Sequence, residues 1–321
     1  MYLKDDIGND KKGWISVIIP TFNRATRLPR AVESCLSQPY DRVEVIVIDD
    51  GSKDNTPEVL YALSSKWGKD HFRWFRQENK GACLARNLGL EKMKGEFVQF
   101  LDSDDLLLPD KFVIQTEALV NSNFPITVCD FAYVDEDLRI LNVEKNEGDL
   151  REKLLRFHGI CISTPLIRSA SIPAGLYFRP EITCGQDVDF FIRYFLGIDG
   201  WIYTPGVWAQ YVMHSDSRIS DTYNQGIQYR TLYWSMSEYW KKSKSELIAS
   251  NKWMLRQYAL NTMSAFHEAG NFRIARLYGM KALLPPFSRN RLYGVVSELA
   301  SQIFPQVLQN AIRKWKNKRI K

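Results

Sequence analysis

Several common features are missing from this chain of 321 residues, and each absence excludes a class of protein. The five cysteines are odd in number, widely spaced and without a Cys-x-x-Cys pair. A zinc site or a disulfide framework is therefore not expected, and a reducing cytoplasm fits. No run approaches the roughly 20 apolar residues of a membrane-spanning helix, and the first residues contain no apolar signal core. A Gly-x-Gly-x-x-Gly loop is also missing, which argues against a dinucleotide-dependent oxidoreductase.

Outside the C-terminal nine residues, basic residues do not outnumber acidic ones. The net charge is +6, and the last nine residues, 313–321, carry six positive charges and no acid. The remainder of the chain is balanced, so it has no broad basic surface of the kind that nucleic acids require. We therefore expect no nucleic-acid partner.

Strand patterns and helix patterns alternate through the first 135 residues. The apolar, β-branched runs expected to form strands are 14–20, 43–48, 72–75, 97–101 and 127–134. Helix patterns fall between them: Leu28, Ala31, Val32 and Cys35 recur at helical spacing, Thr56 caps a second helix, 82–93 forms a third and Pro109 opens a fourth. This alternation predicts an α/β fold with a mostly parallel sheet flanked by helices.

Polar segments follow three of the predicted strands, at 21–23, 49–52 and 102–104. Ligands of open parallel sheets bind beyond the carboxyl ends of the strands. We therefore expect one crevice to collect all three segments.

The acidic segment 102–105 contains three carboxylates in four residues. Asp102 and Asp104 would point to the same side of an extended chain, with Ser103 between them. Hard oxygen ligands of this kind suit Mg²⁺ or Mn²⁺, particularly when phosphate oxygens complete the coordination shell. The alternative interpretation is a solvated acidic turn ahead of a helix. Asp50, in the second segment, could accept a hydrogen bond from a base or a ribose hydroxyl, or could belong to an ordinary polar loop.

Five segments taken together resemble family 2 of the glycosyltransferases, which have the GT-A fold. They are 17–24, 45–56, 79–81, 85–89 and 100–105, and their order and spacing both fit. The resemblance extends over roughly residues 14–215. It implies an inverting transferase that uses a nucleoside-diphosphate sugar, usually a UDP-sugar.

The resemblance also assigns roles to individual residues. The side chains expected to line the nucleoside pocket are those of Pro20, Thr21, Asn23 and Asp50. Those expected near the base, ribose or phosphates are Lys80, Gly81, Arg86 and Asn87, although Arg86 could equally be a salt-bridge residue on a helix surface. In the acidic segment, Asp104 would bind the metal directly, Asp102 would approach the ribose and metal-bound water, and Ser103 would contact the donor.

Inverting transfer needs a base that deprotonates the acceptor hydroxyl. Residues 185–190 stand where the family commonly carries Glu-Asp-x-Asp-Phe, and Asp187 is the expected base, with Asp189 second. Gln186 replaces the usual Glu. The alternative is that Asp187 only caps the helix that starts at Val188. Further on, His214 lies in a segment similar to the family's Tyr-Arg-x-His pattern, with Val212 in place of Arg, and is expected at the metal or diphosphate.

The predicted organisation has four parts. Residues 1–13 form an extension, and 14–220 form the catalytic domain, with a nucleotide half at 14–104 and an acceptor half at 105–220. A helical appendage at 221–294 and an amphipathic basic tail at 295–321 follow. An apolar stripe with a Trp and a basic cluster suits an interfacial helix on an anionic membrane. The tail could instead pack on its own domain.

The predicted activity is transfer of a sugar to a hydroxyl of a glycan or lipid-linked acceptor, in the synthesis of a cell-surface polysaccharide or glycolipid. The protein is expected in the cytoplasm, either free or peripheral on the inner face of the membrane. Two alternatives remain: a sugar-phosphate nucleotidyltransferase, which would need a Gly-rich loop after the first strand, and a non-catalytic nucleotide-sugar-binding scaffold.

Overall fold

The computed structural model describes residues 12–155, 160–182, 185–195 and 197–214. The chain divides into two units, Met1–Thr222 and Tyr223–Lys321, and every described residue belongs to the first. The predicted appendage and tail thus lie outside the described residues, as does nearly all of the N-terminal extension. Their boundaries stay predictions. Within the described ranges, no helix is long and apolar enough to cross a membrane.

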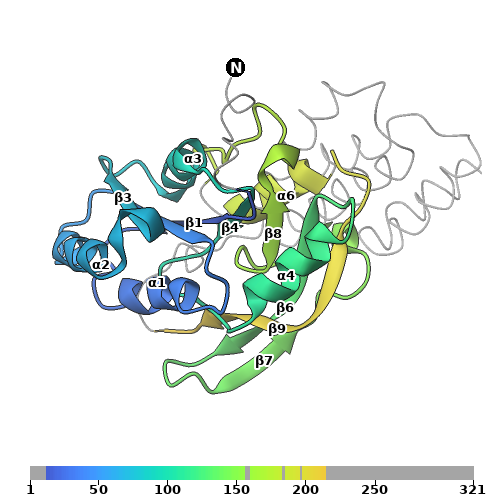
Figure 1. Cartoon of the computed structure of the whole chain (residues 1–321), viewed down its shortest axis with the longest axis horizontal. Helices are drawn as coiled ribbons and strands as arrows, with labels where there is room; N and C mark the ends of the chain where they lie inside the picture. The colour runs from blue at the N-terminus through green and yellow to red at the C-terminus, as the bar shows by residue number, and fades with distance from the viewer. Residues whose placement is uncertain (1–11, 156–159, 183–184, 196, 215–321) are drawn as a thin grey trace, which may run out of the picture. The chain divides into compact units, whose positions relative to one another are not determined.

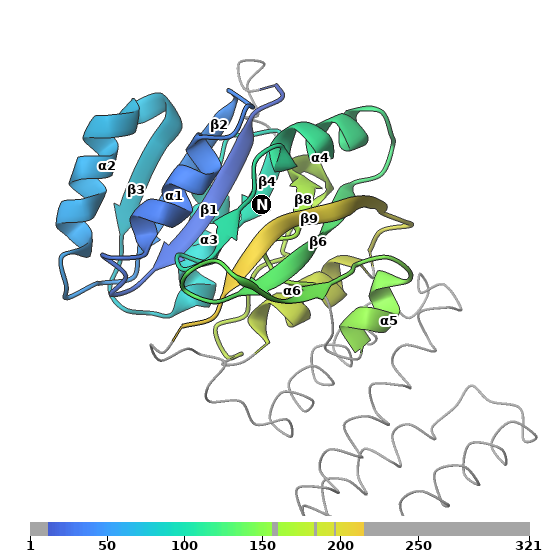
Figure 2. The same cartoon turned by 90° about the horizontal axis from the view of Figure 1, so that it is seen from below.

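The first half of the described unit is a parallel sheet in the order β3-β2-β1-β4 (Figures 1 and 2). Its strands are β1 (Ile15–Thr21), β2 (Val43–Asp49), β3 (Phe72–Arg76) and β4 (Phe97–Phe100). The helices between them are α1 (Leu28–Leu36), α2 (Thr56–His71) and α3 (Ala82–Lys92). Every residue of β1 and β2 is buried, which is why both strands read as continuous apolar runs.

The second half extends the same sheet with mixed strand directions. Its elements are β5 (Leu106–Leu107), α4 (Lys111–Val120), β6 (Ile126–Val134), β7 (Ile140–Glu144), α5 (Leu150–Leu155), β8 (Pro165–Arg168), α6 (Gln186–Phe195) and β9 (Ile202–Val212), with a 3₁₀ turn at Ser169–Ser171. Strand β8 lies between β4 and β6 and is antiparallel to both. Strand β9 runs parallel to β6, and β7 pairs antiparallel with the last residues of β6 (Figure 1).

The predicted α/β sheet flanked by helices is therefore confirmed, and its strand directions are mixed. Parallel pairing holds throughout the first half and between β6 and β9. The antiparallel strands β5 and β8 have only two and four residues, too few for a distinct periodic pattern.

The two faces of the parallel sheet bury different side chains. Leu28, Ala31, Val32 and Cys35 of α1 pack on the odd-numbered residues of β1, as their helical spacing predicts. The other face receives α3, whose Ala85 packs on β2. An aromatic cluster lies at the end of β4, where Phe178 stacks on Phe190 at 4.3 Å between ring centroids. Phe100 meets Phe178 edge-on at 5.1 Å.

Two predicted helix starts are shifted in the structure. Thr56 is the first residue of α2 rather than its cap, which is Asn55, and its hydroxyl donates to Asp54 at 2.6 Å. The helix expected to open at Pro109 begins at Lys111. Asp110, at φ 68°, takes the left-handed conformation that turns the chain into this helix.

Candidate active site

The predicted polar segments meet at the carboxyl edge of the parallel strands. Thr21 ends β1 beside Asp49, which ends β2, and the Asp50 amide donates to the Thr21 carbonyl at 2.9 Å. Asp102 follows two residues after β4, which pairs with β1. The carboxyl edge of the sheet thus brings together residues at the ends of β1, β2 and β4, as the strand pattern predicts.

The loops after β1 and β2 are tied to each other by Asn23. Its backbone amide donates to the Ser52 hydroxyl at 2.9 Å, and its side-chain oxygen accepts from the Lys53 amide at 2.8 Å. These bonds hold Asn23 at φ 52°. Asn23, predicted as a donor contact, therefore also organises the loop.

Pro20 and Thr21 form the buried floor under these loops. Pro20 lies within β1, opposite Ile48. The Thr21 hydroxyl is buried and has no hydrogen-bond partner among the described residues. A buried polar atom without a partner has a free-energy cost that a bound ligand can remove. Thr21 therefore suits its predicted place at the nucleoside.

Asp50 anchors the segment 77–81 that leads into α3. Its carboxylate accepts hydrogen bonds from the Gln77 side chain at 2.7 Å and from the amides of Lys80 and Gly81 at 2.8 Å each. Gly81, at φ 90°, is the N-cap of α3. The Lys80 ammonium is 3.7 Å from Glu78 on the surface. Asp50 therefore holds the loop that carries Lys80 and Gly81, two other residues predicted at the donor. A change at Asp50 would affect donor binding through this loop as well as directly.

Arg86 joins the acidic segment to the start of α6. Its guanidinium donates to Asp102 at 2.7 Å and to the Gln186 side chain at 2.9 Å, and it lies over the Phe178 ring. Only 6% of the residue is exposed. The interpretation of Arg86 as a helix-surface salt-bridge residue is therefore wrong. Its Nε–H is buried without a partner in the described part of the chain.

Asn87 binds the backbone of Phe178 through both ends of its side chain. Its amide nitrogen donates to the Phe178 carbonyl, and its amide oxygen accepts from the Phe178 amide, both at 2.7 Å. Both ends of the side chain thus bind the backbone of the segment before α6. This pairing holds the backbone of Phe178 in place, and a donor contact of Asn87 stays a prediction.

Asp104 lies between two cationic or imidazole side chains. His214 Nε2 is 2.9 Å from its carboxylate, and Arg24 Nε is 3.6 Å from the same oxygen. The contact joins residues 110 positions apart. Ser103, the residue before it, is buried. His214, predicted at the metal or the diphosphate, thus lies against Asp104, the residue predicted to bind the metal directly.

Asp105 fixes the acidic segment to the last strand. Its side chain is 1% exposed and accepts a hydrogen bond from the Val212 amide at 3.0 Å. Val212 stands where the resemblance leads one to expect Arg, and its backbone rather than its side chain reaches the site.

Asp187 is the second residue of α6 and is half-buried. Burial raises the pKa of its carboxyl group; the charge of Arg86 opposes this effect and that of Asp102 adds to it. A carboxylate whose pKa lies above its usual range is a better proton acceptor. Asp187 therefore combines a position beside Asp102 and Arg86 with the acid–base property that a general base needs.

Asp189 is held in a buried ion-pair cluster. Its carboxylate accepts from Arg193 Nε at 3.0 Å and lies 4.0 Å from Arg179. The side chain has no exposed surface. This arrangement makes Asp189 a less suitable base than Asp187, because its carboxylate is buried and paired with arginines.

The residues that would hold a metal form a pair. Among the described residues no group of three or more His, Cys, Asp and Glu side chains is arranged to bind a metal. Asp104 and His214 supply one carboxylate and one imidazole within 2.9 Å, which are ligand types that Mn²⁺ accepts. Asp102 is paired with Arg86 instead. The donor set fits a metal whose remaining ligands come from a diphosphate and water.

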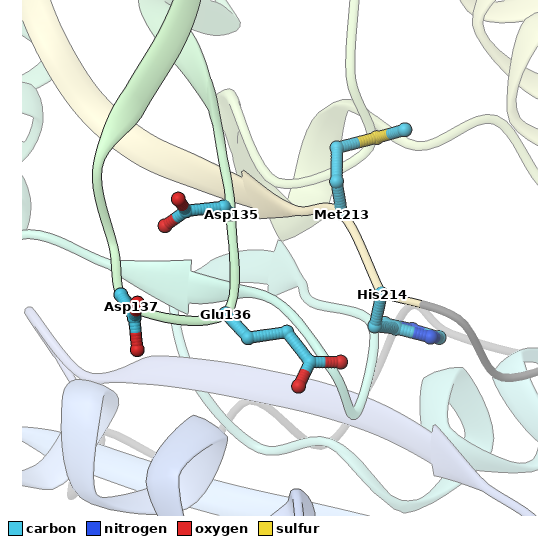
Figure 3. A pocket seen from close by; sticks show the side chains of 5 residues that line it. All are labelled: Asp135, Glu136, Asp137, Met213 and His214. Atoms are coloured by element: carbon cyan, nitrogen blue, oxygen red, sulfur yellow. The ribbon is translucent and has the colours of Figure 1, made fainter.

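A cavity of about 550 Å³ opens next to this pair (Figure 3). Its lining comes from the turn after β6 and from the end of β9: Asp135, Glu136, Asp137, Met213 and His214. Glu136 accepts a hydrogen bond from Arg27 at 3.0 Å. The cavity is therefore strongly acidic at its outer side.

Three residues of the site were not identified from sequence. Arg24 directly follows the predicted Asn23 and approaches Asp104. Gln77 binds Asp50, and Phe178 supports Arg86. Arg24 could have been found from its position after β1. Gln77 and Phe178 carry no such signal, because only the fold brings them to their partners.

The sequence model described as glycosyl transferase family 2 matches residues 16–179, about half of the chain. An uncharacterized glycosyltransferase of Haemophilus influenzae is 29% identical over 239 residues, which cover 74% of this chain and 91% of that protein. An uncharacterized glycosyltransferase of Rickettsia bellii is 32% identical over 177 residues, covering 54% of this chain and 25% of the longer protein.

Two solved structures share the fold at 18% sequence identity. Residues 1–349 of S. aureus TarS, in complex with UDP-GlcNAc, superpose with a TM-score of 0.67 over 84% of this chain and 79% of that one. The mannosyltransferase PcManGT from Pyrobaculum calidifontis, in complex with GDP-Man and Mn²⁺, gives 0.52 over 92% and 87%.

Proposed function

This chain is a glycosyltransferase of family 2, and we propose that it inverts the anomeric centre of a UDP-sugar as it transfers the sugar to an acceptor hydroxyl. The acceptor in this proposal is a glycan or a lipid-linked saccharide, used for a cell-surface polysaccharide or glycolipid. TarS in complex with UDP-GlcNAc supports the choice of UDP, although PcManGT is in complex with GDP-Man.

The observation that carries the proposal is the bridge made by Arg86. One side chain binds Asp102 on the donor side and Gln186, the residue before the proposed base, on the acceptor side. The bridge holds Asp187 at a fixed place relative to Asp102. Such fixed placement of reacting groups supplies much of an enzyme's rate enhancement.

In the proposed step the acceptor oxygen attacks the anomeric carbon while its proton passes to Asp187. The bond between that carbon and the diphosphate oxygen breaks, and its electron pair stays on the diphosphate. A metal held by Asp104 and His214, with Asp102 nearby, would act as a Lewis acid toward the leaving group. We propose Mg²⁺ or Mn²⁺, and the Mn²⁺ with PcManGT supports this choice.

On the donor side, the Thr21 hydroxyl and the Arg86 Nε–H are buried polar groups without protein partners in the described ranges. We propose that both bind the nucleotide. Asp50 acts mainly through the loop that it anchors, and Lys80 extends from that loop toward the phosphates.

The test is the Asp187→Asn variant, assayed for UDP release with and without acceptor sugars. We expect acceptor-dependent turnover to fall by roughly 10²–10⁴-fold, the usual contribution of a general base. UDP binding, measured by thermal shift with Mn²⁺, should stay close to that of the wild type. Retention of full transfer by this variant would show that the base is another residue.

The matched variant Asp104→Asn separates metal binding from base catalysis. It should lose the Mn²⁺-dependent part of the UDP thermal shift, while its melting temperature without ligand changes little because the side chain is partly exposed. A wild-type Mn²⁺ response in this variant contradicts the metal assignment.

A second assay tests the alternative function on the wild-type protein. Production of pyrophosphate from a sugar phosphate and UTP would identify a nucleotidyltransferase.

A further inference from the structure

Arg24 places a positive charge beside the carboxylate that is the proposed metal ligand. Its Nε lies 3.6 Å from Asp104 Oδ2, and His214 Nε2 lies 2.9 Å from the same oxygen. The side chains of Arg24 and Asp104 are only 21% and 17% exposed. Because water is partly excluded from this pair, the two charges interact more strongly than they would on an open surface.

The backbone of Arg24 is anchored on both sides. Its amide donates to the Thr56 hydroxyl at 3.2 Å, which ties it to the start of α2. Its carbonyl accepts from the amides of Arg27 and Leu28 at 3.1 and 2.9 Å, which ties it to the start of α1. The main chain therefore fixes where the long side chain begins, and the guanidinium changes its partner by rotation of the side chain alone.

A metal ion bound by Asp104 and His214 would meet this guanidinium at close range. The carboxylate oxygen that faces Arg24 is the one that faces His214, so it is also the oxygen best placed to coordinate the metal. The metal would compete with Arg24 for this oxygen, and its double positive charge would be repelled by the guanidinium. Arg24 therefore lowers the affinity of the site for a metal that arrives alone.

A diphosphate reverses this effect of Arg24. Phosphate oxygens that coordinate Mg²⁺ or Mn²⁺ offset the charge of the metal, and a guanidinium binds phosphate oxygens in a bidentate manner. The ligands of one metal ion lie close together. A coordinated diphosphate oxygen would therefore be near Asp104 Oδ2, within reach of a guanidinium that already approaches that oxygen.

Building on the proposed metal site, we propose that Arg24 makes the divalent metal and the nucleotide diphosphate bind as a pair. Arg24 opposes a metal that arrives alone, and it passes from Asp104 to the diphosphate when the metal and the nucleotide are both bound. Such coupling is reciprocal, so the metal strengthens nucleotide binding by the same factor by which the nucleotide strengthens metal binding. The site then fills with metal mainly when a donor is present.

The test measures Mn²⁺ binding without nucleotide, and UDP binding with excess Mn²⁺, by calorimetry on the full chain at constant ionic strength. Arg24→Met removes the charge and keeps the apolar stem. Its Kd for Mn²⁺ alone should fall at least about threefold, as removal of a charge repulsion of this kind predicts. Its Kd for UDP with Mn²⁺ should rise about tenfold or more, because a charge-assisted hydrogen bond is lost. Arg24→Lys, which keeps the charge, should restore the wild-type Kd for Mn²⁺ alone.

Arg27→Met is the matched control, because Arg27 is three residues further on and its guanidinium binds Glu136. It removes the same charge from the same loop and should leave both Kd values unchanged. A merely structural role of Arg24 would weaken both binding reactions, so unchanged or weaker binding of Mn²⁺ alone by Arg24→Met overturns the inference. An equal gain in Arg27→Met overturns it as well.

Thermal melts establish that each variant folds, and Arg24→Gln takes the place of Arg24→Met if the latter does not. Asp104→Asn tests the underlying metal site separately. Wild-type binding of Mn²⁺ with UDP by this variant would overturn the proposed metal site itself, whereas its loss leaves the role of Arg24 to be decided by the Arg24 variants.

Discussion

Arg86 connects three residues of the candidate site, Asp102, Gln186 and Phe178. The sequence allowed two interpretations of Arg86: a residue near the donor or a salt-bridge residue on a helix surface. Its burial over Phe178, together with its bonds to Asp102 and Gln186, removes the second possibility. A buried cation of this kind also acts on nearby ionisable groups: Arg86 binds Asp102 at 2.7 Å, and its charge lowers the pKa of Asp187.

The pH dependence of transfer should report that influence. Burial raises the pKa of Asp187, so the acid limb of kcat/KM should lie above the ordinary carboxyl value of about 4. Asp187 acts only when deprotonated, so activity falls as the pH drops through this raised value. Arg86 lowers the pKa of Asp187 and Asp102 raises it. In the residual activity of Arg86→Met, the acid limb of the kcat/KM profile should therefore move to higher pH. In Asp102→Asn, the same acid limb should move to lower pH.

If the acid limbs of Arg86→Met and Asp102→Asn moved in the same direction, these charge effects on Asp187 would be contradicted. If the acid limb disappears in Asp187→Asn but persists in Arg86→Met and Asp102→Asn, the titrating group is the Asp187 carboxyl. The profiles are measured at constant ionic strength, because salt screens the charge interactions that produce the shifts.

Asn87 should behave as a structural residue. Asn87→Ala removes one donor and one acceptor from the Phe178 backbone, and we expect a loss of about 1–3 kcal/mol in the free energy of unfolding. The measurement is urea unfolding, with UDP affinity determined in parallel. If Asn87→Ala lost much of its UDP affinity while its free energy of unfolding stayed unchanged, the result would support the predicted contact of Asn87 with the donor.

At the scale of elements, the contact of α3 with β1 depends on the absence of a side chain at position 89. A Cβ at Gly89 would lie 2.3 Å from Ile18 Cγ2. Gly89→Ala should therefore destabilise the protein by about 1–3 kcal/mol, as overpacking does, despite the better helix propensity of Ala. Glu91→Ala, on the exposed side of the same helix, is the control and should change stability little. Equal stability of the two variants would contradict the close packing.

The elements differ in how far sequence could predict them. Strands β1 and β2 are buried on both faces, so their apolar runs are plain and their ends were predicted within one residue. Strand β8 inserts antiparallel between β4 and β6 with four residues, and nothing in its short sequence indicates that place. Its pairing depends on partners about 40 and 70 positions away.

At the scale of the whole molecule, the basic tail is a prediction from sequence alone, since 295–321 lies outside the described residues. The full chain should co-sediment with vesicles containing about one third anionic phospholipid, because clustered Lys and Arg are attracted to such surfaces. Binding should weaken as salt is raised from 0.05 to about 0.5 M, since screening shortens the range of the attraction.

Two variants make this test specific. Deletion of 295–321 should abolish co-sedimentation. Replacement of the six basic residues of 313–321 by Gln keeps the apolar stripe and should weaken binding at least about tenfold. Undiminished binding by the deletion variant would exclude the tail as the membrane contact and favour its packing on the protein.

The sequence by itself determined the fold class, the crevice at the carboxyl edge and the identity of Asp102, Asp104 and Asp187 as candidates. The fold class, the carboxyl edge, Asp102 and Asp104 need only local information: apolar runs that form buried strands, and polar residues that follow them directly. Asp187 was identified by the resemblance to family 2. The alternation of strands and helices then forces the strand ends together, since parallel strands share one carboxyl edge.

Only the tertiary structure decided which partner each polar side chain has at that edge. It separated Asp187, which is half-buried beside Arg86, from Asp189, which is neutralised by Arg193 and Arg179. It committed Asn87 to the backbone of Phe178, and it brought Tyr133 alongside Tyr211. Each outcome depends on a partner distant in the chain, and burial and pairing energies arise only once the fold has placed both groups together.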